Sequence, residues 1–250
     1  MDLKAVIFDL DGVITKTAKV HAAAWKAMFD EYLRQREERG GDPFREFTTA
    51  DYLQYVDGKP RYKGVASFLE SRGIELPFGD PADPEVAETV CGLGNRKNTK
   101  FVEVLNTKGV EEYGSTVALI KDLLTAGIKV GVASSSKNCQ LVLQKAGLEQ
   151  YFETRVDGVV SHELGLSGKP EGDIFVKAAE NLGCVPAESV VVEDAVSGVQ
   201  AGRNGEFRLV IGVAREDNIK ELQENGAHVV IEDFEGVTAD TVKQWFAQQK

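Results

Sequence analysis

The chain has 250 residues, a formal net charge of −11 and three cysteines. This length can bury a substantial core in one large domain or in two unequal ones. The acidic balance argues against nonspecific binding to nucleic acid or to an anionic membrane, because both depend on basic patches. Any anionic substrate must then be held by a local cluster of cations.

The cysteines and the N-terminus indicate the cellular context. Cys91, Cys139 and Cys184 lack the spacing of a metal site, so we expect reduced, structural thiols. Met1 leads directly into a predicted strand, which leaves no room for a signal peptide, and no apolar run has membrane-spanning length. We therefore expect a cytoplasmic monomer that binds neither a membrane nor nucleic acid.

The first predicted element is a strand that begins near Lys4 and runs into Asp9, Asp11 and Gly12. A near-continuous apolar run is typical of a buried parallel strand, and ligands of open α/β sheets bind beyond the carboxyl ends of the strands. Two carboxylates separated by one residue point in distinct directions, so one can attack a phosphorus while the other handles a proton. Taken alone, two aspartates at this spacing are more often a solvated acidic turn, because Asp and Gly are common turn residues.

A helical block follows the first strand. Residues 18–38 carry apolar side chains at helical spacing until two glycines end the pattern. The region up to residue 105 is also helix-like: a loop at residues 80–84 leads into one predicted helix, and another begins at Arg96. No strand pattern of any strength occurs in this block.

Strands and helices alternate from Ser115 onward. The predicted helices are 117–126, 138–146, 173–182, 196–202 and 218–224, and the predicted strands are 128–133, 155–160, 189–192, 209–213 and 228–231. Short connections between alternating elements imply a doubly wound parallel sheet. We therefore predict an α/β fold with a Rossmann-like core of residues 1–16 and 106–250 and an inserted small α-helical cap of residues 17–105.

Three further polar clusters lie where predicted strands end. Residues 134–138 are rich in serine and lead into a helix N-terminus, which favours an anion, although serines there are also common helix caps. Lys169 precedes a proline-led helix and can neutralise a phosphoryl group, unless it is an ordinary solvated lysine. Glu193 and Asp194 follow an apolar strand, and paired carboxylates at such a place usually indicate a cation.

In these motifs the chain resembles the haloacid dehalogenase superfamily, and within it most closely the β-phosphoglucomutase group. The superfamily motifs occur in order as Asp9-Leu-Asp11-Gly12, Ser134, Lys169-Pro170 and Glu193-Asp194, and the group is indicated by Thr15, Thr17, His21, Ala24-Trp25-Lys26, Ser134 to Asn138 and Lys169 to Phe175. The resemblance implies a small helical cap after the first strand, which the helical pattern had already placed there.

The resemblance also implies roles for the core residues. Asp9 would be the nucleophile that forms an aspartyl phosphate, and Asp11 would be the general acid and base. Mg²⁺ would be held by the Asp9 carboxylate, the Asp11 backbone carbonyl, Glu193 and Asp194. The phosphoryl oxygens would be bound by Ser134, Ser135, Asn138 and Lys169.

In the cap, the resemblance implies a substrate site. Thr17, His21 and Trp25 match the first cap helix, where the histidine couples substrate binding to acid–base alignment. Arg61 resembles the arginine that binds a second, nonreacting phosphate, because its planar fork suits bidentate contact. Lys97 and Asn98 resemble a second cap contact. A polar surface histidine and solvated basic helix ends are the alternatives.

Several departures leave the substrate open. Lys16 stands where the group usually has an acid, and Ala195 replaces a small hydroxyl residue. Extra residues at 36–47 and 76–86 are compatible with a disaccharide phosphate, another hexose phosphate or a partner contact. The pair Gly92 and Gly94 does not indicate a dinucleotide site, because no strand precedes it and the third glycine is missing.

The expected substrate is a sugar phosphate, and two reactions fit it. A mutase would convert β-glucose 1-phosphate to glucose 6-phosphate, whereas a phosphatase would use the same core and let water accept the phosphoryl group. A noncatalytic sugar-phosphate sensor would have no reason to retain Asp9, Asp11, Lys169 and Asp194 together.

Overall fold

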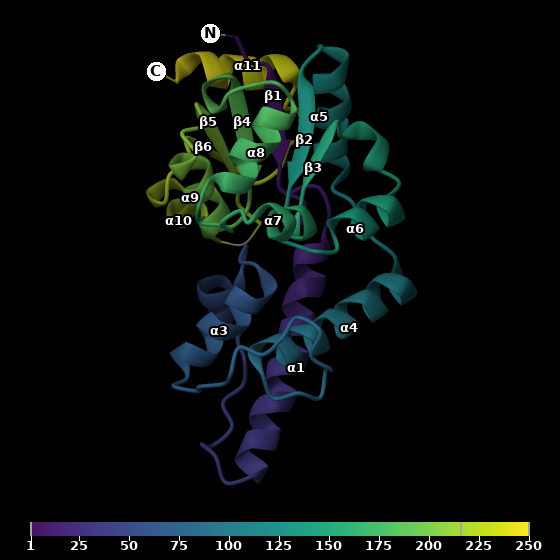
Figure 1. Ribbon diagram of the computed structural model, residues 1–250. Helices are drawn as coiled ribbons and strands as arrows, with labels where there is room; N and C mark the ends of the chain where they lie inside the picture. The colour runs from purple at the N-terminus through teal and green to yellow at the C-terminus, as the bar shows by residue number, and fades with distance from the viewer. Residues whose placement is uncertain (1, 216, 250) are drawn as a thin grey trace. The chain divides into compact units, whose positions relative to one another are not determined.

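The computed structural model describes residues 2–215 and 217–249 and divides into two compact units (Figure 1). One unit contains the chain up to Lys16 and from Val110 onward, and the other is Thr17–Gly109. Helix α4 (Val90–Lys108) ends the second unit and continues beyond residue 105. Within the described residues, no helix has the length and apolar character needed to cross a lipid bilayer.

The first unit is built on a six-stranded parallel sheet with helices on both faces (Figure 1). Its strands are β1 (Ala5–Phe8), β2 (Lys129–Ala133), β3 (Thr154–Val156), β4 (Ser189–Glu193), β5 (Leu209–Val213) and β6 (Val229–Ile231). The order is β3-β2-β1-β4-β5-β6, so the strand order reverses beside β1. Ligands of doubly wound sheets bind at this switch point, and the predicted α/β fold is confirmed.

Helices cover the sheet of this unit on both sides. They are α5 (Gly114–Thr125), α6 (Cys139–Ala146), α7 (Gly158–Leu164), α8 (Asp173–Asn181), α9 (Val196–Asn204), α10 (Ile219–Glu224) and α11 (Ala239–Gln248), with short 3₁₀ turns at Glu149–Tyr151 and Pro186–Glu188. Ile7 and Val191 point toward the face covered by α8, α9 and α10, where they join a buried apolar cluster. All four residues of β1 are buried. Since successive side chains of a strand point to opposite faces of the sheet, both faces are covered at β1, which explains its uninterrupted apolar run.

The strand predicted over residues 155–160 is wrong in its second half. Strand β3 ends at Val156, and α7 begins at Gly158. The side chain of Asp157 accepts hydrogen bonds from the amides of Val159 and Val160, at 2.9 and 3.0 Å, and so caps the helix. This capping outweighs the strand preference of two consecutive valines, because it satisfies amides that would otherwise lack acceptors.

Two helix predictions also need correction. The helix expected after residue 84 is absent from the described chain; α4 instead starts at Val90, where Thr89 accepts from the amide of Gly92. At the C-terminus, α11 is not among the elements that the sequence predicts. Its capping box joins Thr238 to Thr241, whereas the usual sequence signature has Glu or Gln at the second of these positions.

The second unit is all-helical and has its own aromatic core. Its elements are α1 (Thr17–Glu38), α2 (Thr49–Asp51), a π-helix (Tyr52–Val56), α3 (Arg61–Ser71) and α4. Phe29, Phe47 and Phe68 are buried, with ring centroids 4.1 to 5.1 Å apart. Because Phe47 belongs to the extra residues 36–47, this insertion contributes to the core of the cap.

Replacing Phe68 with alanine should destabilise this unit by about 3–5 kcal/mol, because it leaves a cavity among the aromatic rings. Urea unfolding in a Trp245→Phe background measures the loss, because the fluorescence then comes from Trp25 alone, which stacks on Phe29 in the same core. Phe78 is 58% exposed and provides the control: Phe78→Ala should cost less than about 1 kcal/mol. Equal losses would show that the aromatic cluster is not the core of the cap.

Candidate active site

The sheet register brings three predicted site residues to one edge. Phe8 pairs with Val132 of β2 and with Val192 of β4, so the residues that follow these strands are neighbours. The amide of Asp9 donates to the carbonyl of Val192 at 2.9 Å and continues the strand pairing. Asp9, Ser134 and Glu193 therefore leave the sheet at the carboxyl ends of adjacent parallel strands.

A buried ion cluster lies at this edge. The ammonium of Lys169 lies 2.5 Å from Asp9 Oδ1 and also pairs with Glu193 Oε1. The exposed fractions of Asp9, Lys169 and Glu193 are 5%, 2% and 0%. Lys169 is thus not a solvated lysine. When both acids are ionised, two carboxylates share one ammonium, and the cluster has a net charge of −1 in a site shielded from water.

This charge imbalance changes the proton affinities of the cluster. Burial raises the pKa of Asp9 well above its usual value, the nearby Glu193 and Asp11 raise it further, and Lys169 opposes the shift. Burial lowers the pKa of Lys169, but the attraction of Asp9 and Glu193 outweighs burial, and the net shift is upward. Lys169 therefore stays charged, and the cluster favours an additional positive charge.

Glu193 is held from both sides of its carboxylate. Oε1 contacts Lys169, and Oε2 accepts from the amide of Ala195 at 2.7 Å. A Cβ at Gly198 would lie 1.8 Å from Oε1, so only glycine fits there. Glu193 consequently orients Lys169, and any metal contact would have to use its remaining lone pairs.

Asp194 packs against the loop of the first motif. Gly12 has φ +88°, and a Cβ there would lie 1.8 Å from Asp194 Oδ2. Glycine is required for both reasons: the backbone conformation disfavours other residues, and the carboxylate occupies the space of a side chain. The first and fourth motifs are therefore in direct contact.

The donor set is compatible with a divalent cation. Asp9, the Asp11 backbone and Asp194 supply oxygen ligands, which Mg²⁺ prefers, beside a cluster with excess negative charge. Over the described residues, no three His, Cys, Asp or Glu side chains form a ready-made metal site. A metal would thus be held by a mixture of carboxylates, backbone and water.

The serine loop after β2 is organised by its own hydroxyl groups. Ser134 Oγ accepts from the amide of Ser136 at 3.1 Å, and Ser136 Oγ accepts from the amide of Asn138 at 3.1 Å. Ser134 Oγ also lies within 3.5 Å of Asp11 Oδ2. Ser135 and Asn138 are half-buried in the same loop. The loop thus holds Ser134 beside Asp11, while Ser136 stabilises the turn before α6.

In the cap unit, α1 and α4 bring the predicted His21, Trp25 and Lys97 together. The Lys97 ammonium contacts His21 Nδ1 and lies 4.8 Å from the ring centroid of Trp25 and 5.0 Å from that of Phe101. His21 stacks on Phe101 with centroids 3.8 Å apart. Lys97 is only 4% exposed, so it is a buried cation among aromatic rings rather than a solvated helix end.

The other predicted cap residues, Thr17, Arg61 and Asn98, lie on α1, α3 and α4. Arg61, the first residue of α3, donates to Asn98 Oδ1 at 2.7 Å and reaches Asn95 at 3.5 Å. Burial lowers the pKa of Arg61, but the guanidinium remains charged. Thr17 is buried at the start of α1. A Cβ at Gly94 would lie 2.8 Å from the ring of Tyr62, so this glycine serves helix packing.

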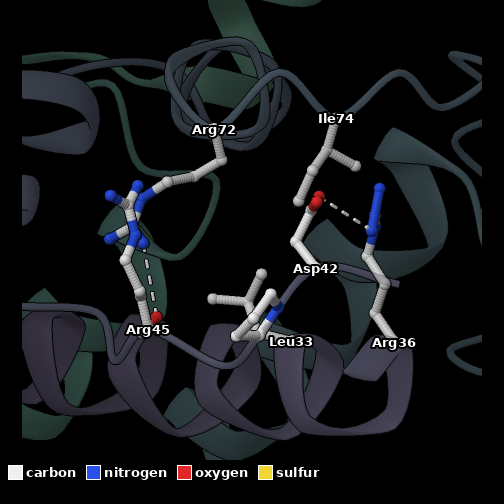
Figure 2. Close-up of a pocket in the computed structure, with 7 residues that line it drawn as sticks. Leu33, Arg36, Asp42, Arg45, Arg72 and Ile74 are labelled. Atoms are coloured by element: carbon white, nitrogen blue, oxygen red, sulfur yellow. Dashed lines mark hydrogen bonds and ion pairs between the residues drawn. The ribbon is translucent and has the colours of Figure 1, made fainter. Parts of the chain in front are cut away.

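A cavity of about 290 Å³ lies elsewhere in the cap unit (Figure 2). Its walls come from α1, the inserted segment and the end of α3, and they are Leu33, Arg36, Asp42, Pro43, Arg45, Arg72 and Ile74. Arg36 pairs with Asp42, and Arg72 donates to the carbonyl of Arg45 at 3.3 Å (Figure 2). None of the residues predicted to bind substrate lines this cavity.

Sequence reasoning missed two residues beside the first and fourth motifs. Arg215 Nε donates to the carbonyl of Gly12 at 2.8 Å, and Asn218 Nδ2 reaches the carbonyl of Asp194 at 3.5 Å. Both follow β5, and a loop after a parallel strand is where site residues are expected. That position is the only signal the sequence offers, because neither residue belongs to a predicted motif.

Known proteins resemble this chain over nearly its whole length. The haloacid dehalogenase-like hydrolase family matches residues 3–206. The chain is 48% identical over 236 residues to a β-phosphoglucomutase of Mycobacterium tuberculosis, covering 93% of this chain and 90% of that protein. It is 26% identical over 236 residues to a phosphorylated carbohydrates phosphatase of Thermotoga maritima, covering 93% and 96%. A solved β-phosphoglucomutase structure from Clostridium difficile has a TM-score of 0.78 at 23% identity over 98% of each chain, which supports the fold. These matches confirm the resemblance predicted from the motifs.

Replacing Asp9 with asparagine should stabilise the metal-free protein by about 1–3 kcal/mol near pH 8, because it leaves Glu193 and Lys169 as a neutral pair. The raised pKa of Asp9 means that the folded state binds the proton more tightly than the unfolded chain. The penalty of the charged form therefore grows as the pH rises from the usual carboxyl range through the raised pKa, and the advantage of the variant should shrink in acid. Thermal unfolding of both proteins in EDTA, from the usual carboxyl pKa range up to pH 8, measures this difference in stability.

Asp157→Asn is the matched control, because Asp157 is equally buried but pairs with Arg155 and caps α7. Its loss of charge should destabilise the protein, in the opposite direction to Asp9→Asn. If Asp9→Asn also lowers stability at pH 8, the cluster does not carry excess negative charge.

Proposed function

Because the chain belongs to the haloacid dehalogenase-like hydrolase family and to its β-phosphoglucomutase-like group of enzymes, we propose that it transfers the phosphoryl group of a sugar phosphate through Asp9. The observation that carries this proposal is the buried cluster in which Lys169 contacts the Asp9 carboxylate beside Asp11 and Ser134. Such a cluster positions a nucleophile and supplies charge to stabilise a transferring phosphoryl group.

The proposed reaction has two steps. In the first, a bond forms between an Asp9 carboxylate oxygen and phosphorus, the ester P–O bond breaks, and Asp11 protonates the leaving oxygen. In the second, Asp11 accepts the proton of an incoming hydroxyl, whose oxygen takes the phosphoryl group from Asp9. Ser134 and Lys169 bind phosphoryl oxygens throughout.

We further propose that a divalent metal, Mg²⁺, is held by Asp9, the Asp11 carbonyl and Asp194, with Glu193 beside it. When bound, the metal would offset the negative charge of the carboxylates and the phosphate, so that an anionic nucleophile can approach. The raised pKa of Asp9 in the metal-free cluster supports this need for a cation.

The favoured substrate is β-glucose 1-phosphate, converted to glucose 6-phosphate by a cytoplasmic monomer. The 48% identity to a protein named β-phosphoglucomutase supports this choice. Arg61 and Lys97 supply the cationic groups that a phosphorylated sugar requires, and Asn98 and His21 contact them. We assign these four residues and Thr17 and Trp25 to substrate binding by the cap.

A phosphatase is the second candidate. The relative named phosphorylated carbohydrates phosphatase covers nearly the same span of the chain. Its first step would be identical, and water would replace the sugar hydroxyl in the second. The two functions therefore differ in the acceptor and share Asp9, Asp11, Ser134 and Lys169.

The nucleophile and the acid–base residue should be separable. Asp9→Asn should abolish labelling of the protein by radioactive acetyl phosphate, because no carboxylate remains to accept the phosphoryl group. Asp11→Asn should still bind phosphate analogues in the presence of Mg²⁺ but lose ~10²–10⁴-fold in turnover, the usual contribution of general acid–base catalysis. Equal and mild effects of both changes, or wild-type rates that EDTA does not affect, would contradict the proposed chemistry.

Product analysis should separate mutase from phosphatase. With β-glucose 1-phosphate and a trace of the 1,6-bisphosphate, a mutase forms glucose 6-phosphate in excess of free phosphate. Arg61→Ala should then lower mutase turnover roughly ten- to a hundredfold, the loss expected for a charge-assisted contact, yet spare hydrolysis of acetyl phosphate, which has no second phosphate. Free phosphate as the main product, with Arg61→Ala unchanged, would favour the phosphatase.

A further inference from the structure

Arg215 contacts the loop that carries the first motif. It lies two residues beyond β5, and its side chain is 13% exposed. Its Nε donates to the carbonyl of Gly12 at 2.8 Å. Its Nη1 donates to the carbonyl of Glu232 at 3.0 Å and pairs with Asp233 at 3.2 Å. The guanidinium therefore joins the loop after β1 to the segment after β6.

The flat face of Arg215 is also occupied. Its Cζ lies 3.6 Å from the ring centroid of Tyr113. The amide of Tyr113 donates to the carbonyl of Ile14 at 2.9 Å, and Thr15 forms a β-bridge with Glu112. The tyrosine is thus fixed to the chain that immediately follows Gly12. Stacking and hydrogen bonding together leave the guanidinium one orientation.

Gly12 is the residue of the first motif with the greatest backbone freedom. A glycine has more backbone freedom than any other residue, and here it adopts φ +88°. One side of its backbone faces the Asp194 carboxylate, where no Cβ fits. Its amide donates to the carbonyl of Thr15 at 2.7 Å, and its carbonyl accepts from Arg215. Arg215 therefore provides the charged contact that fixes the peptide after Gly12.

We infer that Arg215 is a positioning residue of the active site. By holding the Gly12 carbonyl it fixes the direction of the adjacent Asp11 side chain and keeps the loop against Asp194. The consequence for rate rests on the proposed function, since it assumes that Asp11 transfers a proton. The restraint that Arg215 places on the loop does not depend on the proposed function, because it follows from the hydrogen bond to the Gly12 carbonyl alone.

Arg208 offers a matched control in the same unit. Its guanidinium lies 5.0 Å from the ring centroid of Phe246 and donates to the carbonyls of Phe246 and Gln249, at 3.3 and 2.7 Å. It is therefore also an arginine that stacks on an aromatic ring and binds backbone carbonyls. Its contacts are with the C-terminal helix and the residue after it, and it contacts none of the predicted site residues.

The test compares Arg215→Met and Arg215→Lys with Arg208→Met. We expect both methionine variants to lower the melting temperature, but only Arg215→Met to lower kcat by about 10- to 100-fold with little change in KM, as expected for a misaligned catalytic group. Amide hydrogen exchange at Gly12 should accelerate about tenfold or more in Arg215→Met and stay unchanged in Arg208→Met. Arg215→Lys keeps the positive charge but loses the planar guanidinium. Its kcat and its Gly12 exchange rate should lie between those of wild type and Arg215→Met.

Two outcomes would overturn the inference. The first is Gly12 exchange that is unchanged in the folded Arg215→Met or Arg215→Lys variant. The second is a kcat loss no larger than that of Arg208→Met, which would make Arg215 a general stabilising contact. If wild-type protein instead transfers no phosphoryl group, the proposed function fails, while faster Gly12 exchange in the variants still supports the contact of Arg215 with the loop.

Discussion

The active site depends on one buried ammonium shared by two carboxylates. Lys169 lies between Asp9 and Glu193, with almost no solvent access to any of the three. Burying this cluster is costly, and the geometry that offsets the cost comes from the parallel pairing of β1 with β4, which sets both acids at the same edge. The surrounding apolar strands thus determine where the charge can lie. On the proposed function, the remaining negative charge is what a bound cation would offset, so that a phosphoryl group can approach Asp9.

Close packing around two glycines carries this constraint to the other motifs. Gly198 admits the Glu193 carboxylate, and Gly12 admits that of Asp194. In each case a side chain of any size would displace a carboxylate, so the glycines specify the charge arrangement as strictly as the acids do. Arg215 acts on the same loop from its carbonyl side. The site is consequently held by contacts among residues that lie as far apart in the chain as positions 12 and 215.

The cap unit carries its own apolar core together with a buried cation. Its aromatic cluster of Phe29, Phe47 and Phe68 packs the helices of this unit against one another. On α1 and α4, His21 and Lys97 sit among rings that lower the cost of burying a cation. The extra residues 36–47 close part of this core and one wall of the arginine-lined cavity, so their first role is to complete the cap.

The sequence by itself determined the α/β class, the insertion of a helical block after the first strand and the four polar motifs, because apolar periodicity and the residues at strand ends are local properties. It misplaced the end of β3, since two valines indicate a strand while the capping of their amides by Asp157 depends on side-chain geometry. Lys169 taken alone could not be told from a solvated lysine, and only the resemblance to a known family gave it a role at the phosphoryl group. Only the tertiary structure decided that Lys169 is buried between two acids and that Arg215 reaches Gly12, because the partners of a charge come from sheet register and loop packing, which bring together residues that no local pattern connects.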